Sequence, residues 1–122
     1  PFIAGRGLFK IIVVGASFYP DSFTMLCGEK TKGGVNLAVV ALLTLHDNNP
    51  YDKHAVSVSI QGHQVGHLAR ECARAFRRTV RYGTLSIHET FECAALIRGG
   101  WDRGEDDEGG FGVRLDLNLS YD

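Results

Sequence analysis

Residues 46–73 constrain the fold of this 122-residue chain more than any other segment. The segment opens with an Asn-Asn-Pro turn, because proline disfavours the helical conformation in the residue before it. Apolar and polar residues then alternate over residues 56–61, which is typical of a strand that buries one face. Gly62 turns the chain into a second short strand over residues 64–68, and a helix is expected directly afterwards, over residues 69–82. This order of signals predicts a sheet that packs on a helix.

More strands are expected on both sides of this segment. They are predicted at residues 9–14, 37–45, 85–88, 90–97 and 111–119, the last from strict alternation of apolar and polar residues. A turn or a short helix follows Pro20, and residues 99–110 are expected to form a long acidic loop. About six or seven short strands favour a mainly β fold with one or two helices, either a small β-barrel or a curled sheet.

Length and charge limit the possible functions. With 44% hydrophobic residues, the 122 residues suit one domain with one core. The formal net charge is −1, so anion binding requires local clusters of cations rather than a generally basic surface. Pro1 stands where an initiator methionine would, so residues 1–122 are expected to be a domain excised from, or attached to, a larger protein.

The cysteines indicate the compartment. Cys27, Cys72 and Cys93 form no Cys-x-x-Cys pair, which suits a reducing environment and hence an intracellular protein, cytoplasmic in a bacterium or nuclear in a eukaryote. No spacing suits four zinc ligands, and neither a metal nor a cofactor is expected. The longest apolar run, residues 37–45, is too short to span a bilayer, so no membrane partner is expected.

The same segment carries a resemblance to a known family. The residues concerned are Asn49-Pro50-Tyr51-Asp52, Ala55-Val56, Gly62, Val65-Gly66-His67-Leu68 and Arg70-Glu71, preceded by Val14-Gly15-Ala16-Ser17-Phe18-Tyr19. They resemble the signature of the HIRAN domain, a small nucleic-acid-binding module. The resemblance covers residues 10–82 well and implies an OB-like β-barrel with one or two helices. It also implies single-stranded DNA, or DNA 3′ ends, as the partner.

Aromatic residues at strand and loop ends are candidate base contacts. A nucleobase stacks on any aromatic ring, and the resemblance implies that Phe18 and Tyr51 hold the terminal base. Tyr19 and Phe111 fit either a base contact or a place in the core.

Asp52 is the most diagnostic polar residue. A carboxylate repels phosphates but accepts a hydrogen bond from a sugar hydroxyl, and it also stabilises turns by accepting a backbone N–H. The resemblance favours the first role and implies that Asp52 meets the 3′-hydroxyl of DNA, with Asn49 in the same turn as a further contact.

Cations follow at the start of the expected helix. The resemblance implies phosphate contacts for Arg70 and its neighbour His67, although the histidine fits a structural role equally well. Five arginines share one arc of this helix and could either follow a phosphate backbone or form its solvated side: Arg70, Arg74, Arg77, Arg78 and Arg81. The acidic run at residues 105–108 would be unfavourable beside a DNA path.

These features predict a binding module rather than an enzyme. The resemblance implies that it recognises the 3′-hydroxyl end of single-stranded DNA and directs a helicase, translocase or nuclease domain, in the same or another chain, to DNA ends during repair or replication-fork processing. A protein-interaction barrel, which would bind a peptide at a sheet edge, is an alternative. A metal-dependent phosphoester hydrolase using Asp52, His54, His63 and His67 is a weaker one, because such enzymes need several convergent carboxylates.

Overall fold

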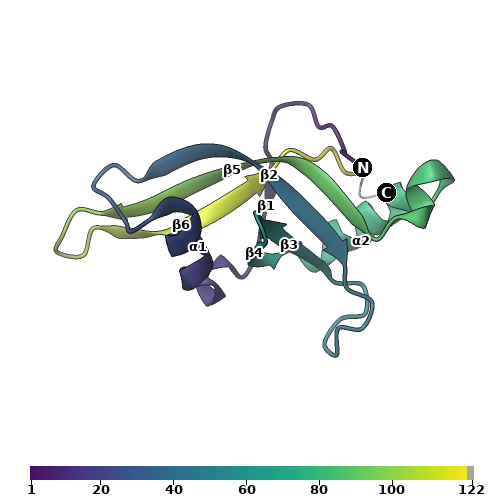
Figure 1. The fold of residues 1–122 in the computed structure, drawn as a ribbon, viewed down its shortest axis with the longest axis horizontal. Coiled ribbons are helices and arrows are strands. Elements are labelled where there is room, and N and C mark those ends of the chain that lie inside the picture. The colour runs from purple at the N-terminus through teal and green to yellow at the C-terminus, as the bar shows by residue number, and fades with distance from the viewer. Residues whose placement is uncertain (121–122) are drawn as a thin grey trace.

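A computed structural model describes residues 1–120, and six antiparallel strands form one curled sheet in it (Figure 1). The strands are β1 (Ile11–Ile12), β2 (Val35–Leu45), β3 (Val56–Ile60), β4 (His63–His67), β5 (Thr90–Asp102) and β6 (Glu108–Leu115). Their order across the sheet is β1-β6-β5-β2-β3-β4. Two α-helices, α1 (Pro20–Cys27) and α2 (Arg70–Val80), and two 3-10 helices, η1 (Ala16–Phe18) and η2 (Gly83–Ile87), complete the fold. The predicted mainly β architecture is confirmed as a curled half-barrel with two helices.

The two edges of the curled sheet meet at one point. Beyond β1, the N–H of Val14 donates to the carbonyl of His67 at 2.9 Å, and the N–H of His67 donates back at 3.0 Å. Gly66 makes this approach possible, because its φ is +153° and an added Cβ would lie 2.3 Å from the Val14 carbonyl oxygen. The Val-Gly-His-Leu motif therefore joins the strand edges at the start of α2.

The core lies between the inner face of the sheet and α2. Val56, Val58 and Ile60 are fully buried, as their alternation predicts. Phe76 of α2 packs edge-to-face on Phe91 of β5, with 5.4 Å between the ring centroids. This packing leaves Arg70, Arg74 and Arg81 exposed, whereas Arg77 and Arg78 are partly buried. No helix within residues 1–120 has the length and apolar character needed to cross a membrane.

The prediction of a strand at residues 85–88 is wrong. These residues belong largely to η2, which begins at Gly83 with a φ of +64°, and the Ser86 hydroxyl donates to the Gly83 carbonyl at 2.7 Å. A local serine–backbone bond thus competes with strand pairing.

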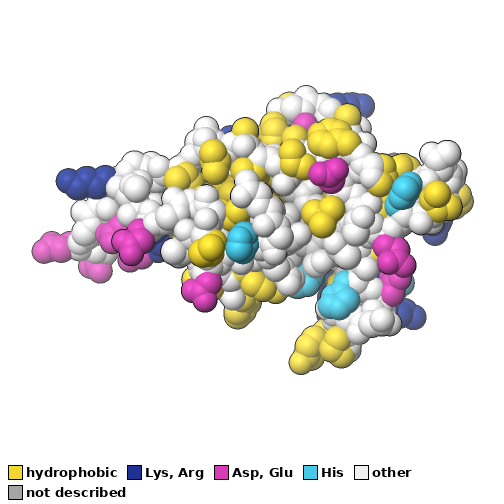
Figure 2. Space-filling model, viewed as in Figure 1, with side chains coloured by type: hydrophobic (Ala, Val, Ile, Leu, Met, Phe, Trp, Pro, Cys, Tyr) yellow, Lys and Arg dark blue, Asp and Glu magenta, His cyan; other side chains and the backbone are white. Residues whose placement is uncertain are grey.

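The acidic loop predicted at residues 99–110 is instead mostly a β-hairpin, because β5 continues to Asp102 and β6 begins at Glu108. The glycines in this hairpin give no apolar–polar alternation, so the strand pairing is not visible in the sequence. They are needed because they leave room for neighbouring rings: a Cβ on Gly109 would lie 2.3 Å from the Trp101 ring. Two strands are also shorter than predicted, ending at Leu115 for β6 and spanning only Ile11–Ile12 for β1. Figure 2 shows acidic side chains gathered at the end of the molecule that Figure 1 assigns to this hairpin, away from the β2–β3 loop.

Candidate nucleic-acid interface

The loop between β2 and β3 is shaped by Asn49. Its side-chain oxygen accepts hydrogen bonds from the backbone N–H groups of Tyr51, at 2.8 Å, and of Asp52, at 3.0 Å. This is the turn that asparagine forms readily, and Pro50 fixes the backbone within it. Asn49 therefore sets the direction of the two residues that follow the proline, whereas its contact with DNA stays a prediction.

Asp52 combines the two roles considered for it. Its Oδ1 accepts the backbone N–H of His54 at 2.9 Å, which stabilises the turn, while its Oδ2 lies 3.9 Å from Nε of Arg70 at the start of α2. The His54 hydrogen bond is the main reason that the pKa of Asp52 lies below its ordinary value, and it outweighs partial desolvation; Arg70, His54 and Arg74 lower it further. The side chain is 19% exposed, so it presents an ionised acceptor at the surface.

Two aromatic rings have no place in the core. Tyr51 is 89% exposed at the tip of the β2–β3 loop, and Phe18 is 83% exposed at the end of η1. Tyr19 is half-buried and is the N-cap residue directly before α1. Exposed rings carried on short, hydrogen-bonded segments are typical of surfaces that stack on a ligand.

His67 is a neutral polar group rather than a cation. It is half-buried, and Nε2 of its ring lies 3.4 Å from the side-chain nitrogen of Gln64. Burial, with a smaller effect from His46, lowers the pKa of His67 below its usual value. The ring is therefore uncharged at neutral pH and suits a hydrogen bond better than an ion pair with phosphate.

Most of these residues surround the junction between β4 and α2. The backbone of Val14 joins the segment before Phe18 to His67, and Asp52 approaches Arg70 from the other side. Figure 1 accordingly shows α1 on one side of β3 and β4, and the β2–β3 loop on the other.

Phe111 has a different environment from the rest of the predicted set. Its half-buried ring stacks on Phe23 of α1, with a centroid distance of 5.3 Å and an interplanar angle of 1°. Because α1 and the β2–β3 loop lie on opposite sides of β4 in Figure 1, this ring is separated from Tyr51 and Asp52. Any base that it contacts would differ from one stacked on Tyr51.

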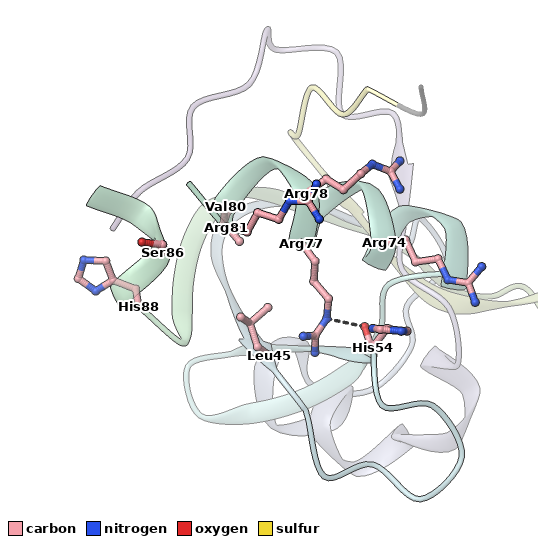
Figure 3. A pocket seen from close by; sticks show the side chains of 9 residues that line it. All are labelled: Leu45, His54, Arg74, Arg77, Arg78, Val80, Arg81, Ser86 and His88. Atoms are coloured by element: carbon pink, nitrogen blue, oxygen red, sulfur yellow. Dashed lines mark hydrogen bonds between the residues drawn. The ribbon is translucent and has the colours of Figure 1, made fainter. Parts of the chain in front are cut away.

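Arg77 has a structural role that the sequence does not distinguish from the roles of the other arginines of α2. Its Nε donates to the carbonyl of His54 at 2.8 Å (Figure 3). One terminal nitrogen donates to the carbonyl of Ala55 at 2.8 Å, and the other lies 2.7 Å from Asp47. Its side chain is only 20% exposed, whereas that of Arg70 is 73% exposed. Arg77 thus fastens the β2–β3 loop to α2, and helical spacing alone does not distinguish it from Arg78.

The proposed hydrolase residues do not form a metal centre. Within residues 1–120, no group of three or more His, Cys, Asp or Glu side chains is placed to hold a metal ion together. Asp52 and His54 are instead engaged with each other and with the turn.

Comparison with known proteins bears on the family rather than on individual site residues. A family model of the HIRAN domain matches residues 6–95. Over 44 residues the chain is 48% identical to helicase-like transcription factor of Mus musculus, a match that covers 35% of this chain and 4% of that protein. No solved structure matches the chain.

Proposed function

The chain belongs to the HIRAN domain family and is therefore a nucleic-acid-binding module, and we propose that it recognises the 3′-hydroxyl end of single-stranded DNA. One observation carries the proposal: the ionised Asp52 carboxylate lies 3.9 Å from Nε of Arg70 and directly follows an exposed tyrosine in the β2–β3 loop. Its Oδ1 is used by the turn, whereas Oδ2 has only the long approach of Arg70 among residues 1–120.

The chemistry of these three groups fits a strand end better than an internal position. The carboxylate accepts a hydrogen bond from a hydroxyl but repels a phosphodiester, and Arg70 is close enough to bind the last phosphate. The exposed ring of Tyr51 offers a flat face to the terminal base, and that of Phe18 offers one to a base of the same strand, regardless of base identity. The combination selects the end of a strand and not its sequence.

The proposed biological role follows from the kind of relative found. The matching protein is named a helicase-like transcription factor, and the match covers only 4% of it. In our proposal, the domain directs a helicase, translocase or nuclease, attached or associated, to free 3′ ends in DNA repair or at replication forks. HIRAN is a binding domain and not a catalytic one, so the chemistry would belong to that partner.

An end-competition experiment tests the proposal. Labelled single-stranded, 3′-overhang, 5′-overhang and blunt oligonucleotides are titrated with the domain, and a circular single strand of the same sequence serves as control. We expect the single strand and the 3′ overhang to bind at least about tenfold more tightly than the other three, because only these two present an unpaired 3′-hydroxyl. Equal affinity for linear and circular single strands would contradict end recognition.

Removing either exposed ring should weaken this binding. Phe18→Ala and Tyr51→Ala are each expected to cost about 1–3 kcal/mol of binding free energy, since each loses one stacking face. Thermal stability should barely change, because both rings are exposed. Phe2→Ala is the matched control: Phe2 is 56% exposed in the N-terminal segment, which Figure 1 shows on the opposite side of the sheet from the β2–β3 loop. A folded Tyr51→Ala variant that binds like the wild type would rule out the stack.

A further inference from the structure

A pocket of about 490 Å³ opens on the side of α2 that faces η2. Leu45 of β2 and Val80 of α2 contribute apolar surface, and Ser86 and His88 lie across from Arg77 in Figure 3. Four arginines dominate the remaining lining, which also includes two histidines and which we call the basic pocket: Arg74, Arg77, Arg78, Arg81, His54 and His88.

Three of these four arginines lack a carboxylate partner. Asp47 neutralises Arg77, but within residues 1–120 no ion pair is formed by Arg74, Arg78 or Arg81. Arg81 rests over the ring of Tyr82, 4.9 Å from its centroid. In a chain with a net charge of −1, this is a marked local excess of positive charge. Such an excess around a concave surface attracts anions.

The basic pocket adjoins the proposed end-binding site through one residue. The N–H of His54 donates to Asp52, and the carbonyl of His54 accepts from Arg77. Arg74 is also near enough to lower the pKa of Asp52. The two sites are therefore consecutive parts of one surface.

The distance along α2 exceeds the length of one nucleotide. Arg70 and Arg81 are eleven residues apart, which corresponds to about 16 Å along a helix axis. A stacked strand advances about 3.4 Å per nucleotide. A strand whose 3′ end lies at Asp52 would thus bring phosphates several nucleotides upstream to Arg78 and Arg81.

We propose that the basic pocket binds backbone phosphates of the strand whose 3′ end is held at Asp52. This inference rests on the proposed function and adds a direction to it: the strand runs from the Asp52 loop along α2 towards η2. Arginine suits this task because its planar fork of donors matches two phosphate oxygens. Arg77 is not assigned to a phosphate, since each of its three nitrogens already donates to a partner within the fold.

A length series tests the inference. Fluorescent oligothymidylates of 3, 6 and 9 nucleotides, all with 3′-hydroxyl ends, are titrated at several salt concentrations. We expect the affinity of the wild type to rise about tenfold from the 3-mer to the 9-mer, and the salt slope to steepen from near −0.7 to near −2, at about −0.7 per phosphate. R78Q/R81Q should bind the 3-mer like the wild type, but its affinity should not rise with oligonucleotide length and its salt slope should stay near that of the 3-mer. R98Q/R114Q, which removes the same charge from β5 and β6, should behave like the wild type.

The outcomes separate the two proposals. If R78Q/R81Q keeps the length dependence while 3′-hydroxyl preference persists, the basic pocket proposal is wrong and end recognition stands. If 3′-hydroxyl preference is absent but R78Q/R81Q still loses the length-dependent gain, end recognition is wrong, and the basic pocket binds phosphates of a strand whose end is not held at Asp52. Calorimetry with inorganic phosphate tests whether the ligand is a free anion. If phosphate binds to the wild type, and the wild type and R78Q/R81Q show the same dependence on oligonucleotide length, the assignment of the pocket to a DNA strand is overturned.

Discussion

A 3′-phosphate on a bound oligonucleotide is expected to weaken binding to the wild-type domain by about a hundredfold or more. The modification removes the hydroxyl donor and places a negative group against the carboxylate of Asp52, whose lowered pKa keeps it ionised throughout the neutral range. Arg70 reduces this repulsion but is 73% exposed and 3.9 Å away, so solvent screens its effect. Fluorescence titration of two oligonucleotides that differ only at the 3′ end measures the difference.

Three comparisons separate charge from hydrogen bonding. A 3′-deoxy end, which lacks the donor without adding charge, should bind only about tenfold more weakly. A 5′-phosphate should matter little. Asp52→Asn should recover part of the affinity for the 3′-phosphate, because its amide oxygen can still accept the His54 N–H while the negative charge is gone. Equal affinity of the wild type for 3′-hydroxyl and 3′-phosphate ends would leave Asp52 as a turn-stabilising residue alone.

Local patterns predicted the part of the fold that surrounds this site. Alternation places Val56, Val58 and Ile60 in the core, and the Asn-Pro turn is built as its residues suggest, because both depend on contacts within a few residues. The exposure of Tyr51 and Phe18 also agrees with the roles that the family resemblance implies. Their contacts with DNA stay predictions.

The features that could not be predicted from the sequence depend on contacts between residues far apart in the chain. The β5–β6 hairpin depends on glycines that admit the rings of Trp101 and Phe111, and glycine carries no hydrophobic signal of its own. Phe111 stacks on Phe23, which is 88 positions away, so alternation within β6 alone does not predict that pairing. Arg77 and Arg78 are chemically identical neighbours, and only the position of the folded β2–β3 loop shows that Arg77 is the one that holds it.

Replacing Arg77 should have the largest effect on stability. Arg77→Ala removes three hydrogen bonds and leaves the carbonyl of His54 without its donor, whereas the carbonyl of Ala55 keeps the N–H of His46. Hydrogen bonds from a charged group contribute about 1.5–3 kcal/mol each when shielded, so we expect the free energy of unfolding to fall by about 3–4 kcal/mol. Urea unfolding followed by circular dichroism measures the change. DNA binding should weaken as well, because the loop that carries Tyr51 and Asp52 loses its attachment to α2.

The geometry of the arginine fork, rather than its charge, should account for this effect. Arg77→Lys keeps the charge but cannot reach two carbonyls and Asp47 together from one ammonium group, so it should recover less than half of the lost stability. Arg74→Ala is the matched control, since Arg74 is exposed on the same helix and its loss should change the unfolding free energy by no more than about 0.5 kcal/mol. If Arg77→Ala unfolds at the same urea concentration as Arg74→Ala, the loop is held by its own turn through Asn49 and Asp52, and Arg77 then belongs with the other arginines of the basic pocket as a candidate phosphate contact.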